Sequence, residues 1–420
     1  MFDYKFSENN RSPENNRLSE NNKPLEKHIN SFVKYFLSGC KSRDLYKIGF
    51  ELEHLVLDKN KNPLPFLDES QGGKSVENVL KKLKKYYKTC EYSQNHLIGL
   101  SRDKIVISLE PGAQLEVSIG PCKTSGEIEM LYKEFRQQID PILSDFGFSL
   151  VNLGYQPKVR ASEISLIPKE RYRVFDKTFV DEKASGKYMM RATASTQITL
   201  DYSNEADAME KFKFLFALGP IWALFFANTP VFEGKANYNP LVRSVIWRKT
   251  DPIRAGLIKE VFSNYSFEKY ACLLDTIPLL VTPRGDAHSA PACQIYPNRE
   301  LTVAEIEYII SNVFFDVRMK NFLELRTVDS LKIGQVMQLI NSVVGSVYNS
   351  KKFFQIKEFL GDITFDDVKN AKKQIILKGD QAKVYGHSVE EFRELLGLEL
   401  VLDEGLEEGL ESGLEAGLEK

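Results

Sequence analysis

Acidic side chains recur on one face of several short segments in which polar and apolar residues alternate. The segments are residues 48–53, 107–118, 191–201 and 322–326. Side chains of a β-strand alternate between its two faces, so Glu51 and Glu53 point to one side while Phe50 and Leu52 point to the other. We therefore expect strands of a sheet that has one packed face and one carboxylate-rich face.

The same alternation places further polar groups on the carboxylate-rich face. They are Glu110, Gln114 and Glu116 in the second segment, Arg191, Thr193, Ser195 and Gln197 in the third, and Glu324 and Arg326 in the fourth. An antiparallel sheet whose second face simply meets water would also alternate. Such faces usually mix lysine with glutamate, whereas these five glutamates share their face with no lysine. Because clustered carboxylates repel one another unless cations lie between them, the pattern favours a Mg²⁺ or Mn²⁺ site that also takes phosphates.

Longer runs of sequence surround these segments. They are ISLEPGAQLEVSIGP at 107–121, GYQPK at 154–158, IPKERY at 167–172, MMRATASTQITLD at 189–201, RSVIWRKTDPIRAG at 243–256 and DVRMKNFLELR at 316–326. In this order and at these separations they resemble the plant-type and related bacterial glutamate-cysteine ligases (bacterial type 2). The likeness covers about residues 45–390, and several independent motifs make it more specific than one short pattern.

The resemblance implies a fold and a reaction. The fold would be α+β, with a curved, mainly antiparallel sheet shaped as a funnel and surrounded by helices, as in glutamine synthetase and related carboxylate-amine ligases. In the reaction, the γ-carboxylate of L-glutamate attacks the γ-phosphate of ATP. The amine of L-cysteine then displaces phosphate from γ-glutamyl phosphate, which is the first step of glutathione biosynthesis. Phosphoryl transfer depends on positioning and on cations that take up charge, so ATP, two or three Mg²⁺ ions (or Mn²⁺) and arginines are expected.

The resemblance also implies roles for individual residues. The metal ligands would be Glu51, Glu53, Glu110, Glu116 and Glu324, with Gln197 as a weaker ligand. Arg326 would contact the transferring phosphoryl group, and an ion pair with a neighbouring glutamate is the alternative. Arg243 and Trp247 would bind substrate glutamate, since arginine can grip a carboxylate with two hydrogen bonds. Arg191, Arg248 and Arg254 would assist, or serve only as structural or surface arginines.

Other candidates carry weaker signals. Lys320 would reach a phosphate or lie solvated on a helix face, and His54 has the parity of a core histidine. The run SQGGKS at 70–75 ends like a phosphate-binding loop, but Asp68 stands where that motif needs its first glycine. His288 lies in a turn-rich stretch and is expected to mark a loop. ATP phosphates would therefore be held by metal ions and arginines.

The coarse pattern of elements is mixed. Helices are predicted at 24–40, 75–89, 124–146, 205–228, 302–319, 331–348, 365–378 and 388–397, and a further strand near 149–156. Strands and helices do not alternate regularly, which favours α+β over a doubly wound parallel sheet. The apolar stretch 214–227 is too short to cross a bilayer and predicts a core helix that begins anew near Pro220, so no membrane role is expected.

Repeats mark both ends of the chain. Residues 1–24 are polar and repetitive, which predicts a disordered tail, and residues 399–420 carry Gly-Leu-Glu repeats. Glycine at every fourth position weakens a helix, so a frayed tail is favoured over an oligomerisation element. Residues 25–398 are then expected to form a single catalytic domain, as a monomer or a homodimer.

Composition limits the partners. With 420 residues, 43% of them hydrophobic, the chain can bury a large core, and a net charge of −2 supplies no basic face for nucleic acid. The five widely spaced cysteines include no Cys-x-x-Cys pair, which favours free buried thiols and a reducing cytoplasm.

Departures from the plant pattern leave the acceptor amine open. Residues 50–53 lack the histidine that usually separates the two glutamates, and residues 192–196 replace a plant segment around a cysteine. Three hypotheses follow: a glutamate-cysteine ligase, a related ligase joining glutamate to a different amine, and a metal-dependent hydrolase or binding protein built on the same sheet. The retention of all five glutamates with Arg326 argues against the third.

Overall fold

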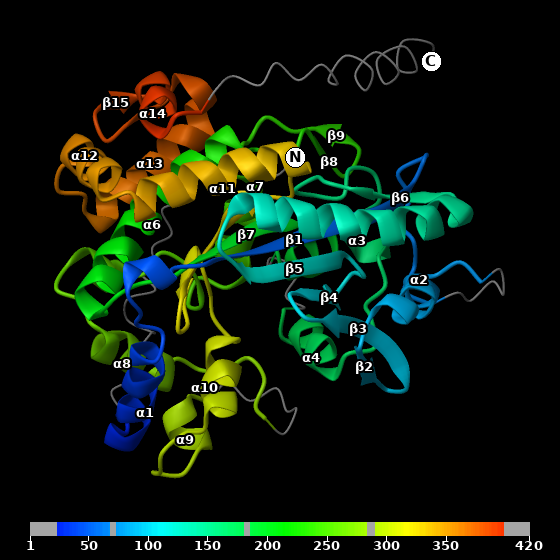
Figure 1. Ribbon diagram of the computed structural model, residues 1–420, viewed down its shortest axis with the longest axis horizontal. Helices are drawn as coiled ribbons and strands as arrows, with labels where there is room; N and C mark the ends of the chain where they lie inside the picture. Colours follow the sequence, from blue (N-terminus) through cyan, green and yellow to red (C-terminus); the bar gives the residue numbers. More distant parts are fainter. Residues whose placement is uncertain (1–22, 68–72, 180–184, 284–289, 399–420) are drawn as a thin grey trace.

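A large antiparallel sheet runs through the middle of the molecule (Figure 1). The computed structural model of the chain describes residues 23–67, 73–179, 185–283 and 290–398. The strands of this sheet are β1 (Ile48–Asp58), β2 (Thr89–Ser93), β3 (His96–Arg102), β4 (Ile105–Leu109), β5 (Leu115–Cys122), β6 (Phe148–Val151), β7 (Ser195–Leu200), β12 (Val317–Met319) and β13 (Leu323–Asp329). Their order is β12-β13-β7-β1-β5-β4-β3-β2, with β6 paired to the far end of β1, and every pairing is antiparallel.

Three long helices cover one face of the sheet. They are α3 (Ser125–Phe146), α6 (Glu205–Phe225) and α11 (Ile333–Tyr348). Figure 1 shows α3 and α11 lying across the near side of β1, β5 and β7, and α6 packs against β12 and β13. Helix α3 begins where the Thr124 side chain accepts a hydrogen bond from the Glu127 N–H and ends at Gly147, whose φ of 78° suits glycine. The apolar side chains of β1, such as Phe50 and Leu52, are buried on this face, which leaves the opposite face to the carboxylates.

Further elements surround this core. The other helices are α1 (Glu26–Leu37), α2 (Val76–Leu83), α4 (Glu170–Thr178), α5 (Gly186–Ala192), α7 (Val242–Thr250), α8 (Phe267–Thr276), α9 (Ala292–Ile295), α10 (Val303–Ile310), α12 (Ser350–Leu360), α13 (Phe365–Lys378) and α14 (Val389–Leu396). Short 3₁₀ turns lie at Arg43–Leu45, Lys84–Tyr86, Ala161–Glu163, Lys259–Phe262 and Gly379–Gln381. Two-residue strands pair as β8 (Val231–Phe232) with β9 (Lys235–Ala236), β10 (Ala255–Gly256) with β11 (Phe314–Phe315), and β14 (Lys383–Val384) with β15 (His387–Ser388). One hydrophobic cluster reaches from Ile29 to Leu396.

The predicted α+β class with an antiparallel sheet and surrounding helices is confirmed. Seven of the eight predicted helices are present. Six of them shift by at most three residues at either end, whereas α2 ends at Leu83, six residues before the predicted end. The helix that contains Pro220 does not begin anew there, because α6 is continuous from Glu205 to Phe225. None of the helices in the described ranges is long and apolar enough to cross a membrane.

Two predicted strands are wrong in their extent. Residues 107–118 do not form one strand: β4 ends at Leu109, and a turn with Ala113 at a φ of 64° leads into β5. Residues 191–194 precede β7, and Arg191 lies in α5. The alternating pattern continues through both breaks, so periodicity alone did not reveal them.

The predicted helix 302–319 is wrong in its second half. Helix α10 ends at Ile310, and the chain then enters β11 and β12. Lys320 consequently lies in the turn between β12 and β13 rather than on a helix face. The apolar residues that follow α10 pack in the sheet, so tertiary packing overrode local propensity.

The structure also shows the surroundings of His54, Ser75 and the cysteines. His54 is a core histidine: its Nδ1 lies 3.0 Å from the Leu115 carbonyl and its Nε2 lies 2.9 Å from the Tyr132 hydroxyl, and burial lowers its pKa to about 3. Ser75 caps α2. The five cysteines are free thiols, of which Cys122 is buried and the others are partly buried. Residues 1–22 of the N-terminal tail, the whole C-terminal tail and His288 lie outside the described residues.

Candidate active site

Three glutamates meet on the carboxylate face of the sheet. Glu53 of β1 and Glu116 of β5 are direct partners in the β1–β5 register, and Glu110 reaches them from the turn after β4. One carboxylate oxygen from each lies within 4.8 Å of the others. This is the arrangement that the alternation predicted for these three residues.

Burial and mutual repulsion disfavour ionisation of this group. The pKa of Glu110 is raised well above its usual range by burial and by the charges of Glu53 and Glu116. Burial likewise raises the pKa of Glu53 and of Glu116, and Glu53 adds to the rise at Glu116. Glu51 lies near Glu116 and Glu324, and burial together with these two charges raises its pKa to about 7.

Neutral donors hold two of the three carboxylates. Ser195 binds Glu53 twice, through its N–H at 2.7 Å from Oε2 and its hydroxyl at 2.7 Å from Oε1, and Gln197 Nε2 donates to Oε1 at 3.1 Å. The Ser108 hydroxyl donates to Glu116 Oε1 at 2.6 Å. Within the described residues, no Lys or Arg is ion-paired to Glu53, Glu110 or Glu116.

Glu324 has the opposite surroundings. Its Oε2 accepts hydrogen bonds from Arg318 Nε at 2.7 Å and Arg326 Nη1 at 2.8 Å, and Lys320 Nζ lies 3.3 Å from its Oε1. Arg318 is its direct partner in the β12–β13 register. Burial of Glu324 opposes ionisation, but these three cations hold its pKa well below the usual range.

Gln197 connects the two groups. Its amide oxygen accepts from Arg326 Nη1, and its amide nitrogen donates to Glu53 and lies 3.3 Å from the Ser195 hydroxyl. An arginine can only donate, so this orientation of the amide is the one that satisfies both neighbours. The sequence-based metal roles of Glu324 and Gln197 stay predictions, because here Glu324 contacts cations and the Gln197 oxygen contacts Arg326.

Arg243 lies at the edge of the carboxylate group. It is buried on α7, donates through Nη1 to the Val328 carbonyl at 2.8 Å, and lies 3.8 Å from Asp329 Oδ1. Its Nε is buried without a hydrogen-bond partner among the described residues. Glu53 and Arg243 interact electrostatically, so the guanidinium is close enough to the site to receive an anionic group. Trp247, one turn along α7, stacks on Phe314 with ring centroids 4.8 Å apart.

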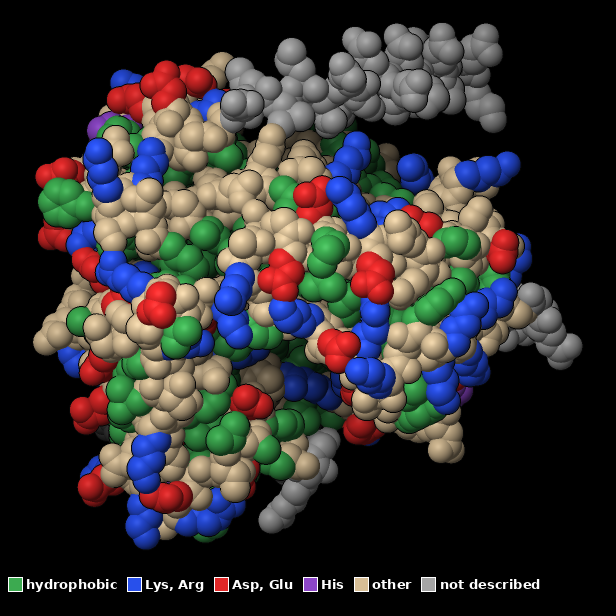
Figure 2. Space-filling view, in the orientation of Figure 1, with side chains coloured by type: hydrophobic (Ala, Val, Ile, Leu, Met, Phe, Trp, Pro, Cys, Tyr) green, Lys and Arg blue, Asp and Glu red, His purple; other side chains and the backbone are tan. Residues whose placement is uncertain are grey.

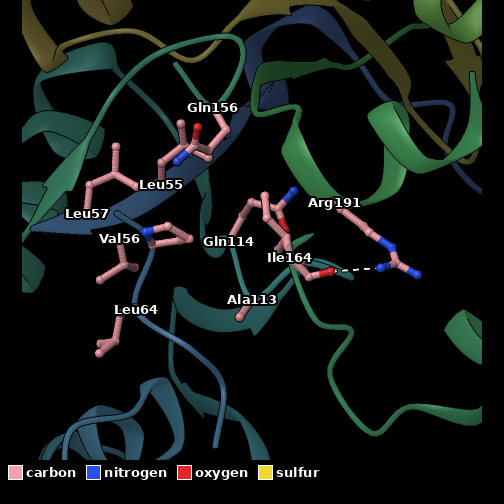
Figure 3. Close-up of a pocket in the computed structure, with 11 residues that line it drawn as sticks. Leu55, Val56, Leu57, Leu64, Ala113, Gln114, Gln156, Ile164 and Arg191 are labelled. Atoms are coloured by element: carbon pink, nitrogen blue, oxygen red, sulfur yellow. Dashed lines mark hydrogen bonds between the residues drawn. The ribbon is translucent and has the colours of Figure 1, made fainter. Parts of the chain in front are cut away.

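The structure corrects the expectation for Arg191. Figure 3 shows its side chain directed to the Ile164 carbonyl, to which Nη1 donates at 2.8 Å. Its Nη2 pairs with Asp176 at 2.7 Å. Gln114, predicted on the carboxylate face, instead donates to the carbonyls of Met190 and Thr193 and lines the same small cavity as Arg191. Neither side chain lies on the strand face that the alternation predicted, because Arg191 belongs to α5 and Gln114 to the turn before β5.

For the other two helper arginines, the described contacts fit the alternative of a structural or surface residue. Arg254 pairs with Asp251 at 2.6 Å and donates to the Pro278 carbonyl, which makes it structural. Arg248 lies on the exposed side of α7. Neither forms an ion pair with a carboxylate of the site among the described contacts.

Sequence reasoning missed functional neighbours of the site. Arg318 was hidden by the helix predicted to run to 319, although its place six residues before Glu324 fits a hairpin. Arg171 and Tyr172 of α4 were quoted only within a motif. The Tyr172 hydroxyl donates to the Leu109 carbonyl beside Glu110, and Arg171 interacts electrostatically with Glu110 and Arg318. Figure 2 shows the surface hollowed between the region of α1 and α8–α10 and that of β2–β4 and α4, with Lys and Arg side chains in its depth.

The donor set fits a hard divalent cation. Burial raises the pKa of all three carboxyl groups, and the charge of Glu53 adds to the rise at Glu110 and Glu116. A cation between them would favour their ionised forms, and oxygen ligands suit Mg²⁺ and Mn²⁺. The nearby cluster of Arg318, Lys320 and Arg326 carries more positive charge than Glu324 neutralises. A ligand that offers oxygens to a metal on one side and negative charge to arginines on the other matches both, as a nucleotide polyphosphate does.

Comparisons with known proteins agree with this chemistry. The chain is 28% identical over 407 residues to a chloroplastic glutamate-cysteine ligase of Medicago truncatula, covering 92% of this chain and 78% of that protein. It is 29% identical over 366 residues to the Arabidopsis thaliana enzyme, covering 84% and 69%. A crystal structure of a glutamate-cysteine ligase of Francisella tularensis in complex with AMP matches with a TM-score of 0.52 at 12% identity, over 84% of this chain and 76% of that chain, which supports the fold. Residues 47–349 match the model of glutamate-cysteine ligase family 2, and the chain belongs to that family.

Proposed function

We propose that this protein joins the γ-carboxylate of L-glutamate to the amine of L-cysteine, with ATP converted to ADP and phosphate. The glutamate carboxylate attacks the γ-phosphorus and releases ADP, and the amine then attacks the acyl carbon of γ-glutamyl phosphate and releases phosphate and a proton. The observation that carries the proposal is that one site holds both the Glu53–Glu110–Glu116 group and the cations around Glu324. The product, γ-glutamylcysteine, is the first intermediate of glutathione biosynthesis.

Glu53, Glu110 and Glu116 would hold Mg²⁺, with Mn²⁺ as the alternative ion and Glu51 as a further ligand. Glu324 and Gln197 would complete the set that the family resemblance implies, for two or three ions. Bound there, the ions would supply positive charge to the phosphate oxygens of ATP. The support from the structure is the ligand spacing and the raised pKa of these carboxyl groups.

The cations around Glu324 would act on the phosphoryl group. Arg326 is fixed by Glu324 and Gln197, so its guanidinium is already oriented before a nucleotide arrives. Arg318 and Lys320 flank it, and all three would take up the negative charge that spreads over the equatorial oxygens during transfer. Burial strengthens these electrostatic interactions because water screens them less.

Arg243 would bind substrate glutamate. Its buried Nε has no partner among the described residues, while its Nη1 is anchored by the Val328 carbonyl. An anchored guanidinium with a free N–H is suited to a carboxylate. Trp247 of α7 stacks on Phe314 of β11, and the two rings would form an apolar wall for the methylene groups of that substrate.

The test is ADP release by the purified protein with Mg²⁺, ATP and L-glutamate, with and without L-cysteine, and mass spectrometry of the product. Cysteine-dependent ADP release with the mass of γ-glutamylcysteine is the expected result. Release that another amine stimulates instead would favour the related ligase with a different acceptor. That alternative is supported by residues 192–196, which differ from the plant pattern and include Ser195, whose N–H donates to Glu53. No ADP release with any amine would overturn the ligase proposal.

The proposal extends to the assembly, partners and compartment of the protein. The protein would work as a monomer or a homodimer on small-molecule substrates, without nucleic acid or membrane partners. A reducing compartment such as the cytoplasm would suit its free thiols.

A further inference from the structure

Four polar side chains form a row across neighbouring strands of the carboxylate face. Ser108 of β4 lies directly opposite Glu116 of β5, and Glu116 lies directly opposite Glu53 of β1. Ser195, at the start of β7, follows Glu53 on the other side and binds it. The order across the sheet is therefore serine, glutamate, glutamate, serine.

The two glutamates at the centre of the row repel each other. Residues directly opposite in an antiparallel pair have Cβ atoms about 5 Å apart, and like charges at that separation destabilise the pair. Each glutamate has a serine hydroxyl on the side away from its partner, at 2.6 Å for Ser108 and Glu116 and at 2.7 Å for Ser195 and Glu53. Each hydrogen bond therefore pulls its carboxylate outward and fixes its rotation.

A hydroxyl orients a carboxylate without neutralising it. At Glu324, the donors are Arg318, Lys320 and Arg326, which cancel the charge that a metal ion would need. At Glu53 and Glu116, the side-chain donors are serine hydroxyls and the Gln197 amide, all uncharged. A carboxylate has about four lone-pair positions, so each of these two keeps free lone pairs, and none of these hydrogen-bond donors cancels the negative charge of its ionised form.

We propose that Ser108 and Ser195 are positioning residues for the metal carboxylates: their hydroxyls set the gap between Glu116 and Glu53 so that a divalent cation fits between them. This inference rests on the proposed function, because it presumes that the carboxylates bind a metal ion. Groups that hydrogen-bond to metal ligands typically change metal affinity by about 10- to 100-fold when they are removed. The two serines differ in importance. Glu53 also accepts hydrogen bonds from the Ser195 N–H and from Gln197, whereas among the described contacts the Glu116 side chain accepts its hydrogen bond from Ser108.

The experiment measures Mn²⁺ binding to the metal-free full chain by calorimetry, without nucleotide. We expect Ser108→Ala to weaken binding about tenfold or more and Ser195→Ala to weaken it by a smaller factor. Ser108→Thr retains the hydroxyl at a half-buried position and is expected to restore most of the affinity. The matched control is Ser118→Ala on the same strand and face as Glu116, at a serine with no hydrogen bond to a glutamate among the described contacts.

Kinetics and melting separate positioning from a general structural role. The Mg²⁺ concentration for half-maximal activity is expected to rise in Ser108→Ala in step with the loss of Mn²⁺ affinity. At saturating Mg²⁺, kcat is expected to stay within about threefold, because the hydroxyl touches a carboxylate rather than a substrate. The melting temperature of the metal-free variant reports folding independently of metal.

Two results would overturn the inference. One is unchanged Mn²⁺ affinity in Ser108→Ala and Ser195→Ala, and the other is an equal loss in Ser118→Ala. If the unaltered protein binds Mn²⁺ and makes γ-glutamylcysteine while the serine variants bind normally, only the positioning role fails. If the unaltered protein binds no Mn²⁺, the metal site and the positioning role fail together.

Discussion

Two parts of one sheet face hold buried or partly buried glutamates in opposite electrostatic states. At Glu53, Glu110 and Glu116 no Lys or Arg is ion-paired to the carboxylate within the described residues, and the pKa of each is raised. At Glu324 the neighbours are two arginines and a lysine, and the pKa is lowered. Burial acts in the same direction at all four residues, so the difference comes from the charges beside them.

The two parts of the site are suited to different ligands. The carboxylate part is deficient in positive charge and can accept a metal ion, whereas the cationic part has charge to offer to phosphate. Gln197 joins them through Arg326 on one side and Glu53 on the other. A substrate that carries several negative oxygens could contact both parts at once. It would then bind more tightly than to either part alone.

The largest effect is expected where the cationic part meets the phosphoryl group. Arg326→Ala is expected to lower kcat about 10³-fold or more, as for arginines that stabilise phosphoryl transfer. Steady-state ADP release measures it, with melting temperature as the folding control. Activity within tenfold of the unaltered protein would contradict the role of Arg326.

The next effect separates the two parts directly. Glu116→Gln is expected to weaken Mn²⁺ binding about tenfold more than Glu324→Gln, because Glu116 lies in the three-carboxylate group and Glu324 is held by cations. Calorimetry without nucleotide compares the two variants. Equal losses would show that Glu324 contributes as much to metal binding as Glu116 and would contradict the division between the two parts.

The carboxylate part also predicts a pH dependence. A carboxyl whose folded-state pKa is raised contributes stability that is fully present below the unfolded pKa and is lost as pH rises through the folded pKa. For Glu51 that folded value is about 7, and the pKa of Glu53, Glu110 and Glu116 is raised as well. Metal-free protein should therefore lose stability as pH rises from about 5 to about 8.

Mg²⁺ binding requires the ionised carboxylates, so its stabilising effect should grow over the same range. The gap between melting temperatures with and without Mg²⁺ is expected to widen with pH. A gap that stays constant or narrows would contradict the raised pKa values of this group.

The smallest effect is expected away from both parts. Arg191 binds Ile164 and Asp176 rather than a site carboxylate. Arg191→Met should lower the free energy of unfolding by about 1–3 kcal/mol, through a lost charged hydrogen bond and a partly buried ion pair. The Mg²⁺ affinity and the KM for ATP should change by less than about threefold. A selective loss of glutamate affinity would restore the role that the sequence suggested for Arg191.

The sequence predicted the positions of the site carboxylates better than those of the side chains that surround them. Alternation placed Glu51 and Glu53 correctly, and it placed Glu110 and Glu116 on one face even though a turn separates their strands. It failed at Arg318 and Lys320, because the residues after α10 read as more helix until they pair with β13. It also failed at Arg191, whose helical turn before β7 continues the alternating pattern by coincidence.

The sequence by itself determined which ligands are available and to which family the chain belongs, because both depend on residue types at fixed spacings along single strands. Only the tertiary structure decided which charge lies beside which carboxylate. Arg318 faces Glu324 and Ser108 faces Glu116 through strand register, and register arises from pairings between segments distant in sequence. The electrostatic state of a buried carboxylate depends on those neighbours within a few ångströms, which no single segment specifies.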